Sequence, residues 1–140
     1  MDWKECSDKR IAKAIKPDIG LINSLIKSSN KRLESSNRLE LDEVTAEAKL
    51  SLAYDSLREV LEALCIENGY KIYNHECYTA FLKEILMESR IGDNFDEMRK
   101  IRNAINYYGK DVTVKEAEEV INKIISIRLS VIKLLKTRPV

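Results

Sequence analysis

The sequence predicts an all-α protein, an up-down bundle of about five helices, on three observations. Apolar residues recur at helical spacing over long stretches, most clearly from about Glu43 to Glu67. Only four glycines and two prolines occur, and Gly69, Gly92 and Gly109 divide the second half into pieces of helix length. The sequence also lacks an alternating strand pattern with hairpin signals.

The first helices are expected in the N-terminal third of the chain. Residues 1–16 are predicted to form a short helical extension with three apolar contacts: Trp3, Ile11 and Ile15. Pro17-Asp18 indicates a new start, and a helix is expected from about Asp18 to Leu39. Its apolar residues follow gaps close to 3.6 on one face: Ile19, Ile22, Ile26 and Leu33.

The helix from about Glu43 to Glu67 is the strongest prediction. It carries a broad apolar stripe, the width expected of a buried bundle helix: Leu50, Ala53, Tyr54, Leu57, Val60, Leu61 and Leu64. Asn68-Gly69 is typical of a helix C-cap and ends it.

Three further helices complete the prediction. Asn74 is a candidate N-cap for a third helix that closes at Arg90–Asp93 and turns six apolar residues inward: Cys77, Tyr78, Phe81, Leu82, Ile85 and Leu86. A short fourth helix is expected from about Phe95 to Tyr107, with Gly109 as a left-handed stop. The last helix begins with the capping box Thr113-x-x-Glu116 and continues to Leu135.

Composition places the chain among ordinary globular proteins. At 140 residues it is predicted to form one domain over residues 1–140. The net charge of +1 argues against a constitutive, charge-driven nucleic-acid binder but is compatible with a local basic patch. No apolar run approaches the roughly 18 to 20 residues that span a bilayer, so no membrane association is expected. The N-terminus lacks a basic-then-apolar signal segment, so the cytoplasm is the expected location.

The cysteines predict neither a disulfide framework nor a metal site. Cys6, Cys65 and Cys77 are an odd number without CxxC spacing, so reduced thiols are expected. Cys65 and Cys77 lie among apolar residues and are expected in the core. His75 and Cys77 could supply two metal ligands, but the chain has no other histidine, so no metal and no cofactor is predicted.

The segment Met98–Gly109 carries the residues with chemical potential. Arg102 and Asn106 are four apart and share a helix face, Arg99 and Asn103 lie on an adjoining stripe, and Tyr107 and Tyr108 end the helix. A guanidinium beside amides and phenols suits a phosphate or a nucleotide edge, which gives six candidate ligand-binding residues: Arg99, Arg102, Asn103, Asn106, Tyr107 and Tyr108.

Two alternatives need no ligand. In the first, Arg99, Lys100 and Arg102 form a solvated face that pairs with Asp96 and Glu97. In the second, the rings of the two tyrosines cover the core and their hydroxyls stay in solvent, so the rings do not stack on bases.

The order of the motifs resembles a HEPN domain. A long helical hairpin leads through Gly69 to the helix start Asn74-His75-Glu76-Cys77 and then to a short helix containing Ile101-Arg102-Asn103 before the terminal helix. The resemblance is best over residues 43–136, and residues 1–17 correspond to an N-terminal extension.

In catalytic HEPN proteins, the resemblance implies a metal-independent ribonuclease whose two subunits place an Arg-polar-x(n)-His motif across a dimer. Arg102 matches the arginine, Asn103 the polar neighbour, and Tyr107 or Tyr108 the trailing aromatic residue. The histidine position falls on Asn106 or Tyr107. An amide has no titratable proton near neutral pH, and phenol has a pKa near 10, so general acid–base assistance is missing. His75 is expected to make local hydrogen bonds near a helix N-terminus.

The sequence therefore predicts a catalytically degenerate HEPN-like module that forms a homodimer and binds a nucleotide, an RNA or a partner protein. By resemblance, the partner is a small nucleotidyltransferase in a toxin–antitoxin setting. Two alternatives stay open: a ribonuclease with an altered site using Arg102, Asn103 and Tyr107 or Tyr108, and a structural adaptor without a ligand.

Overall fold

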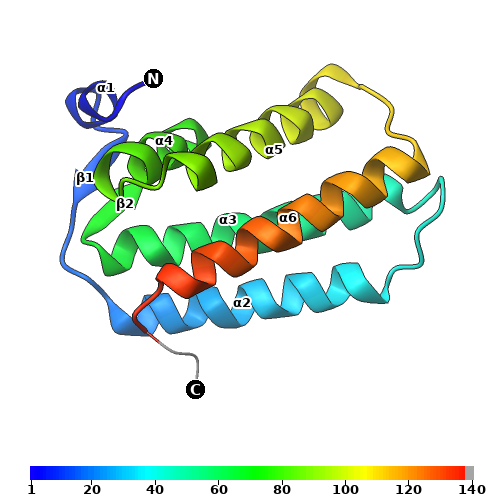
Figure 1. Cartoon of the computed structure of the whole chain (residues 1–140). Coiled ribbons are helices and arrows are strands. Elements are labelled where there is room, and N and C mark those ends of the chain that lie inside the picture. Colours follow the sequence, from blue (N-terminus) through cyan, green and yellow to red (C-terminus); the bar gives the residue numbers. More distant parts are fainter. Residues whose placement is uncertain (138–140) are drawn as a thin grey trace.

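Four long helices packed side by side make up most of the protein (Figure 1). The computed structural model describes residues 1–137, and its long helices are α2 (Ile19–Arg38), α3 (Ala46–Glu67), α5 (Ser89–Tyr108) and α6 (Val114–Leu134). Helix α3 is the centre of the bundle, because it makes the most extensive contacts, with α2 and with α6. Its predicted apolar stripe from Leu50 to Leu64 is buried. The all-α helical bundle is confirmed.

Local capping signals position most helix ends as predicted. The Asp18 side chain accepts a hydrogen bond from the Leu21 amide at 3.0 Å and begins α2. The Thr113 hydroxyl accepts one from the Glu116 amide at 3.1 Å and begins α6. Gly109 adopts φ 64° directly after α5, the left-handed conformation that ends a helix.

A small antiparallel sheet is present, although the sequence shows no alternating strand pattern with hairpin signals. Strand β1 (Ala12–Ala14) pairs with β2 (Tyr70–Ile72), with Ala12 opposite Ile72. The predicted helical extension is therefore helical only over α1 (Trp3–Asp8). Strands of three residues are too short to show the alternation that identifies strands in a sequence.

The predicted break near Gly92 is also wrong. Helix α4 (His75–Ala80) continues into a π-helical turn, η1 (Phe81–Ile85), and the chain then turns at Met87, which has φ 57°. Helix α5 starts at Ser89, so Gly92 is inside it and buried. A Cβ at Gly92 would lie 2.5 Å from Cγ of Lys83, so this glycine allows a close approach between α5 and η1 rather than ending a helix.

The cysteine prediction needs a correction as well. Cys6 in α1 and Cys77 in α4 form a disulfide, with their Cα atoms 6.0 Å apart, while Cys65 is a buried free thiol. The bond joins residues 71 positions apart, a proximity that only the fold creates. Because the Cys77 sulfur is bonded, it cannot join His75 in binding a metal.

A polar group is buried where α6 meets α2. Arg128 is 5% exposed. Its Nε donates to the Ser29 hydroxyl at 3.1 Å and its Nη2 donates to Oδ1 of Asn30 at 2.6 Å. The Ser29 hydroxyl in turn donates to the Ser56 carbonyl on α3 at 2.6 Å. This network links three helices through hydrogen bonds rather than through an ion pair.

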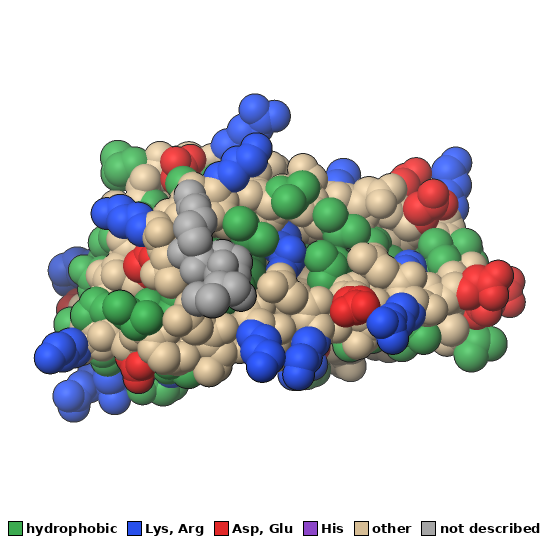
Figure 2. Space-filling model, turned by 90° about the horizontal axis from the view of Figure 1, so that it is seen from below, with side chains coloured by type: hydrophobic (Ala, Val, Ile, Leu, Met, Phe, Trp, Pro, Cys, Tyr) green, Lys and Arg blue, Asp and Glu red, His purple; other side chains and the backbone are tan. Residues whose placement is uncertain are grey.

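The face seen from below carries mixed charge. In the described part of that face, basic and acidic side chains are interspersed with exposed apolar ones, so no continuous basic field forms there (Figure 2). Among residues 1–137, no helix is both long and apolar enough to cross a membrane.

Candidate functional site

The basic residues of α5 have different surroundings. Arg99 donates from Nε and Nη2 to Oδ1 of Asp96 at 3.0 and 2.9 Å, and Lys100 lies 3.2 Å from the other oxygen of that carboxylate. The two cations therefore share one carboxylate, and the pairing expected for a solvated face is found for both of them. Arg99, a predicted ligand-binding residue, is already held in a local ion pair.

Arg102 is different, because no carboxylate reaches it closely. Its nearest acidic atom, Oδ1 of Asp55, lies 4.0 Å from Nη2. The guanidinium carbon lies 5.2 Å from the ring centre of Tyr54 and 5.9 Å from that of Tyr107, within the range of cation–π contacts. The side chain is only 17% exposed, and its buried Nε has no hydrogen-bond partner among residues 1–137. Arg102 is thus a fixed cation with unused donors.

Tyr54 connects Arg102 to the single histidine. The Tyr54 hydroxyl lies 3.1 Å from Nδ1 of His75. Burial raises the pKa of Tyr54 well above its usual value of 10, so the phenol keeps its proton. Because the described residues offer this hydroxyl no other acceptor, we assign the bond as Tyr54 donating to Nδ1, which leaves the imidazole proton on Nε2.

The imidazole at this position is neutral. Burial lowers the pKa of His75 to about 4, and the positive charges of Arg58, Arg102 and Arg99 act in the same direction. His75 makes a hydrogen bond, but its partner is Tyr54 of α3 rather than a group near the N-terminus of its own helix, so this bond is not the local one expected.

The remaining predicted residues lie at the end of α5. Tyr107 is 71% exposed and Tyr108 83% exposed, so neither covers the core. Asn106 is exposed and Asn103 half-buried. Within the described chain, neither amide side chain makes a hydrogen bond. The structure therefore brings Tyr107 to Arg102, while Asn103, Asn106 and Tyr108 remain unengaged groups on the same helix.

Sequence reasoning missed the contribution of α3. The helical pattern places Tyr54 in the core stripe and indicates no role for Asp55 and Arg58. All three face the His75–Arg102 region, because Asp55 is the nearest acid to Arg102 and Arg58 contributes to the low pKa of His75. Polar residues directly beside a buried tyrosine were the available signal.

Metal binding finds no support in the described part of the chain. None of its His, Cys, Asp and Glu side chains gather in a group of three or more that could hold an ion. The donors of this region are the guanidinium of Arg102, the phenol of Tyr107 and the imidazole N–H of His75, which suit an anion rather than a cation.

Comparison with known protein families gives one match. A family model described as HEPN domain matches residues 22–134. The chain belongs to the HEPN family. Comparison with curated proteins and with solved structures gives no significant match. The family resemblance inferred from motif order is therefore confirmed, and the match also includes most of α2.

The residues that stand where the family resemblance places a histidine, Asn106 and Tyr107, are both exposed at the end of α5. The only histidine of the chain, His75, lies on α4 beside Tyr54 instead.

Proposed function

We propose that this HEPN domain binds a nucleotide or RNA phosphate through Arg102 and has little or no ribonuclease activity. The supporting observation is that Arg102 is held between Tyr54 and Tyr107 with an unused Nε donor and no carboxylate closer than 4.0 Å. A partly desolvated guanidinium forms strong, charge-assisted hydrogen bonds with phosphate.

The neighbouring groups complete this proposed site. Asn103 and Asn106 offer neutral amide donors, and the exposed rings of Tyr107 and Tyr108 offer surfaces on which bases stack. Asn106 and Tyr107 place an amide and a phenol, rather than an imidazole, where the family resemblance expects a histidine, so the proposed module lacks general-base assistance there, which is worth about a hundred- to ten-thousandfold.

Binding can be tested with a matched pair of variants. Fluorescence anisotropy with a labelled single-stranded RNA should show that Arg102→Ala weakens binding about tenfold to a hundredfold, the loss expected for a hydrogen bond to a charged group. Arg90→Ala is the control, because Arg90 is exposed on the same helix and its removal changes the net charge equally. Equal effects of the two substitutions would reject Arg102 as the binding residue.

The assembly follows from the family resemblance and is part of the proposal. A homodimer would place two Arg102 sites on one composite surface, and a small nucleotidyltransferase would be the partner in a toxin–antitoxin setting. Light scattering that gives a monomer at micromolar concentration would reject the dimer.

The proposed location is the cytoplasm. Disulfides are rare in most cytosolic proteins, so the redox state of Cys6 and Cys77 in cells tests this location.

A ribonuclease with an altered site is the second candidate, favoured by one observation. The single histidine lies 3.1 Å from the tyrosine on which Arg102 stacks, so an imidazole and an arginine share this region. Metal-free RNA cleavage that disappears in both His75→Ala and Arg102→Ala would establish this activity.

A further inference from the structure

A second cluster of cations and an aromatic ring lies on the two-stranded sheet. Lys13 of β1 is the register partner of Lys71 of β2, so both side chains lie on the same sheet face. Tyr73 follows Lys71 by two residues and continues that face, because its amide donates to the Ile11 carbonyl at 2.9 Å and extends the pairing. We name Lys13, Lys71 and Tyr73 the ribbon platform.

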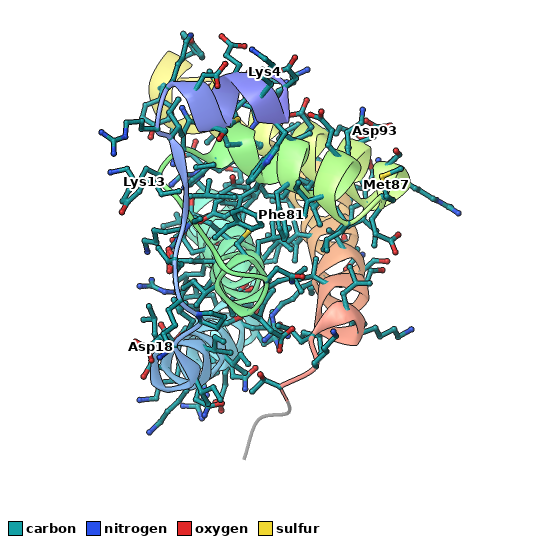
Figure 3. All side chains as sticks on the ribbon, turned by 90° about the vertical axis from the view of Figure 1, so that its left-hand side faces the viewer. Lys4, Lys13, Asp18, Phe81, Met87 and Asp93 are labelled. Carbon is teal, nitrogen blue, oxygen red and sulfur yellow. A yellow bond between two sulfur atoms is a disulfide. The ribbon has the colours of Figure 1, made fainter. Side chains whose placement is uncertain are left out.

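Lys13 and Tyr73 of the platform are exposed, whereas Lys71 is partly buried, with 28% of its side chain exposed. The ammonium groups of Lys13 and Lys71 lie 5.4 and 6.0 Å from the ring centre of Tyr73, and this ring is 63% exposed. Lys13 projects at the periphery of the sheet end of the molecule (Figure 3). An open ring with a cation on each strand beside it offers a base a stacking surface and offers the adjoining phosphates two charges.

Stability alone does not account for this arrangement. Directly opposed like charges destabilise a strand pair. Lys71 has a partner in Glu62 at 3.4 Å, but within residues 1–137 Lys13 forms no ion pair. The other side of the sheet buries Ala12 and Ile72, so the fold is anchored there and not through the platform.

A row of residues on α3 links the platform to the Arg102 site. Tyr54, Arg58 and Glu62 are spaced four apart and therefore lie along one side of the helix. At one end of the row Glu62 contacts Lys71 at 3.4 Å, and Glu62 lies 3.7 Å from Arg58. At the other end of the row, the guanidinium of Arg102 lies over the ring of Tyr54.

The row spans about 12 Å of helix, at 1.5 Å for each of eight residues. This is longer than one nucleotide. Arg58 adds a cation midway, next to His75 and Tyr54.

We propose that the ribbon platform is a second contact for single-stranded RNA that is also bound at Arg102. The inference rests on the proposed function of Arg102 and extends it from one phosphate to a strand. A strand, rather than a duplex, is expected because an exposed ring can stack only on an unpaired base.

The experiment measures anisotropy of a labelled 12-nucleotide RNA and a dinucleotide at several salt concentrations. For the long RNA, Lys13→Gln/Lys71→Gln should weaken binding and reduce the salt slope by about 1.4, the value for two lost phosphate contacts on a single strand. Tyr73→Ala should weaken it at least about fivefold, and Tyr73→Phe should retain it. Dinucleotide binding should be unchanged by all three.

Controls separate this inference from the proposed function. Lys27→Gln/Lys31→Gln removes two exposed lysines of α2 and should leave the salt slope unchanged. If Arg102→Ala abolishes binding while the platform variants bind the long RNA normally, the platform is rejected and the Arg102 site stands. If the platform variants lose binding of the long RNA and Arg102→Ala keeps it, the Arg102 site is rejected and the platform stands.

Two outcomes would overturn the choice of ligand. A polyglutamate peptide that displaces the RNA equally well from the native protein and from Tyr73→Ala would show that the platform recognises charge alone, as for an acidic peptide. Equal affinity for DNA of the same sequence would reject RNA as the preferred strand. Absence of any RNA binding by the native protein would reject both the platform and the proposed function.

Discussion

The single histidine allows a direct test of the electrostatics at the Arg102 site. Burial, with the charges of Arg58, Arg102 and Arg99, lowers the pKa of His75 to about 4. At pH 7 an ordinary imidazole with a pKa of 6.5 is protonated in about a quarter of molecules, whereas one with a pKa of 4 is protonated in about one in a thousand. We therefore expect His75 to be neutral throughout the physiological range.

This pKa also predicts how stability changes with pH. The unfolded chain takes up the proton near pH 6.5 and the folded chain only near pH 4, so the unfolded state binds more protons between these values. The contribution of His75 to stability is complete above pH 6.5, falls as the pH decreases toward 4, and changes no further below that. The full difference corresponds to about 3.4 kcal/mol, which solvent screening of the half-buried ring reduces to roughly 1–2 kcal/mol.

Proton NMR provides the assay, because one histidine gives one Hε1 titration curve without assignment. Arg102→Gln should move the midpoint upward toward 6.5, since it removes a nearby cation, while Arg90→Gln should leave it in place. Urea unfolding at pH 5 and pH 7.5 should show a smaller pH dependence in His75→Gln than in the native protein. A midpoint near 6.5 in the native protein would refute the reasoning about burial and arginine charge.

Three further predictions concern stability. Cys6→Ser/Cys77→Ser should lower the free energy of unfolding by about 4 kcal/mol, from the loop entropy of a 71-residue separation, and urea midpoints with and without reductant check this. An unchanged midpoint after reduction would contradict it. Arg128→Ala should lower the free energy of unfolding by about 3 kcal/mol. Arg128→Met should lower it clearly less, because the longer methionine side chain fills the space without a buried charge. Urea unfolding of Gly109→Ala should show a free energy of unfolding lower by about 1 kcal/mol, because φ at this position is 64° and an alanine there is strained.

The sequence predicted those parts of the fold that depend on neighbouring residues. The caps at Asp18 and Thr113 and the left-handed Gly109 each act within one helical turn, so their patterns are visible in the chain. Gly92 was misassigned because a glycine that ends a helix and one that permits close packing look the same without the neighbouring element, here η1.

The parts that could not be predicted join distant residues. Pairing of β1 with β2 and the bond between Cys6 and Cys77 bring together residues 56 or more positions apart, for which no local pattern exists. The Arg102 site shows the same limit. Its position on α5 followed from the motif, but Tyr54 and His75 reach it from α3 and α4.

The hydrogen bond between Tyr54 and His75 bears on the choice between binder and nuclease. A general base needs a free lone pair, and in neutral imidazole only one ring nitrogen carries it. In the tautomer that we assign, that nitrogen is Nδ1 of His75, and it already accepts the Tyr54 hydroxyl at 3.1 Å. The other nitrogen bears a proton and can only donate. His75 therefore suits a hydrogen bond to a bound phosphate better than proton abstraction from a ribose hydroxyl.

This difference can be measured in Tyr54→Phe, which frees Nδ1 while keeping the ring beneath Arg102. For a binding module, the variant should hold RNA nearly as well as the native protein and remain without cleavage at pH 5 and pH 7. For a nuclease that uses His75 as its base, the freed lone pair should increase cleavage, most strongly above the pKa of the imidazole. Cleavage that rises in Tyr54→Phe and vanishes in Tyr54→Phe/His75→Gln would reverse the assignment of this domain as a binder.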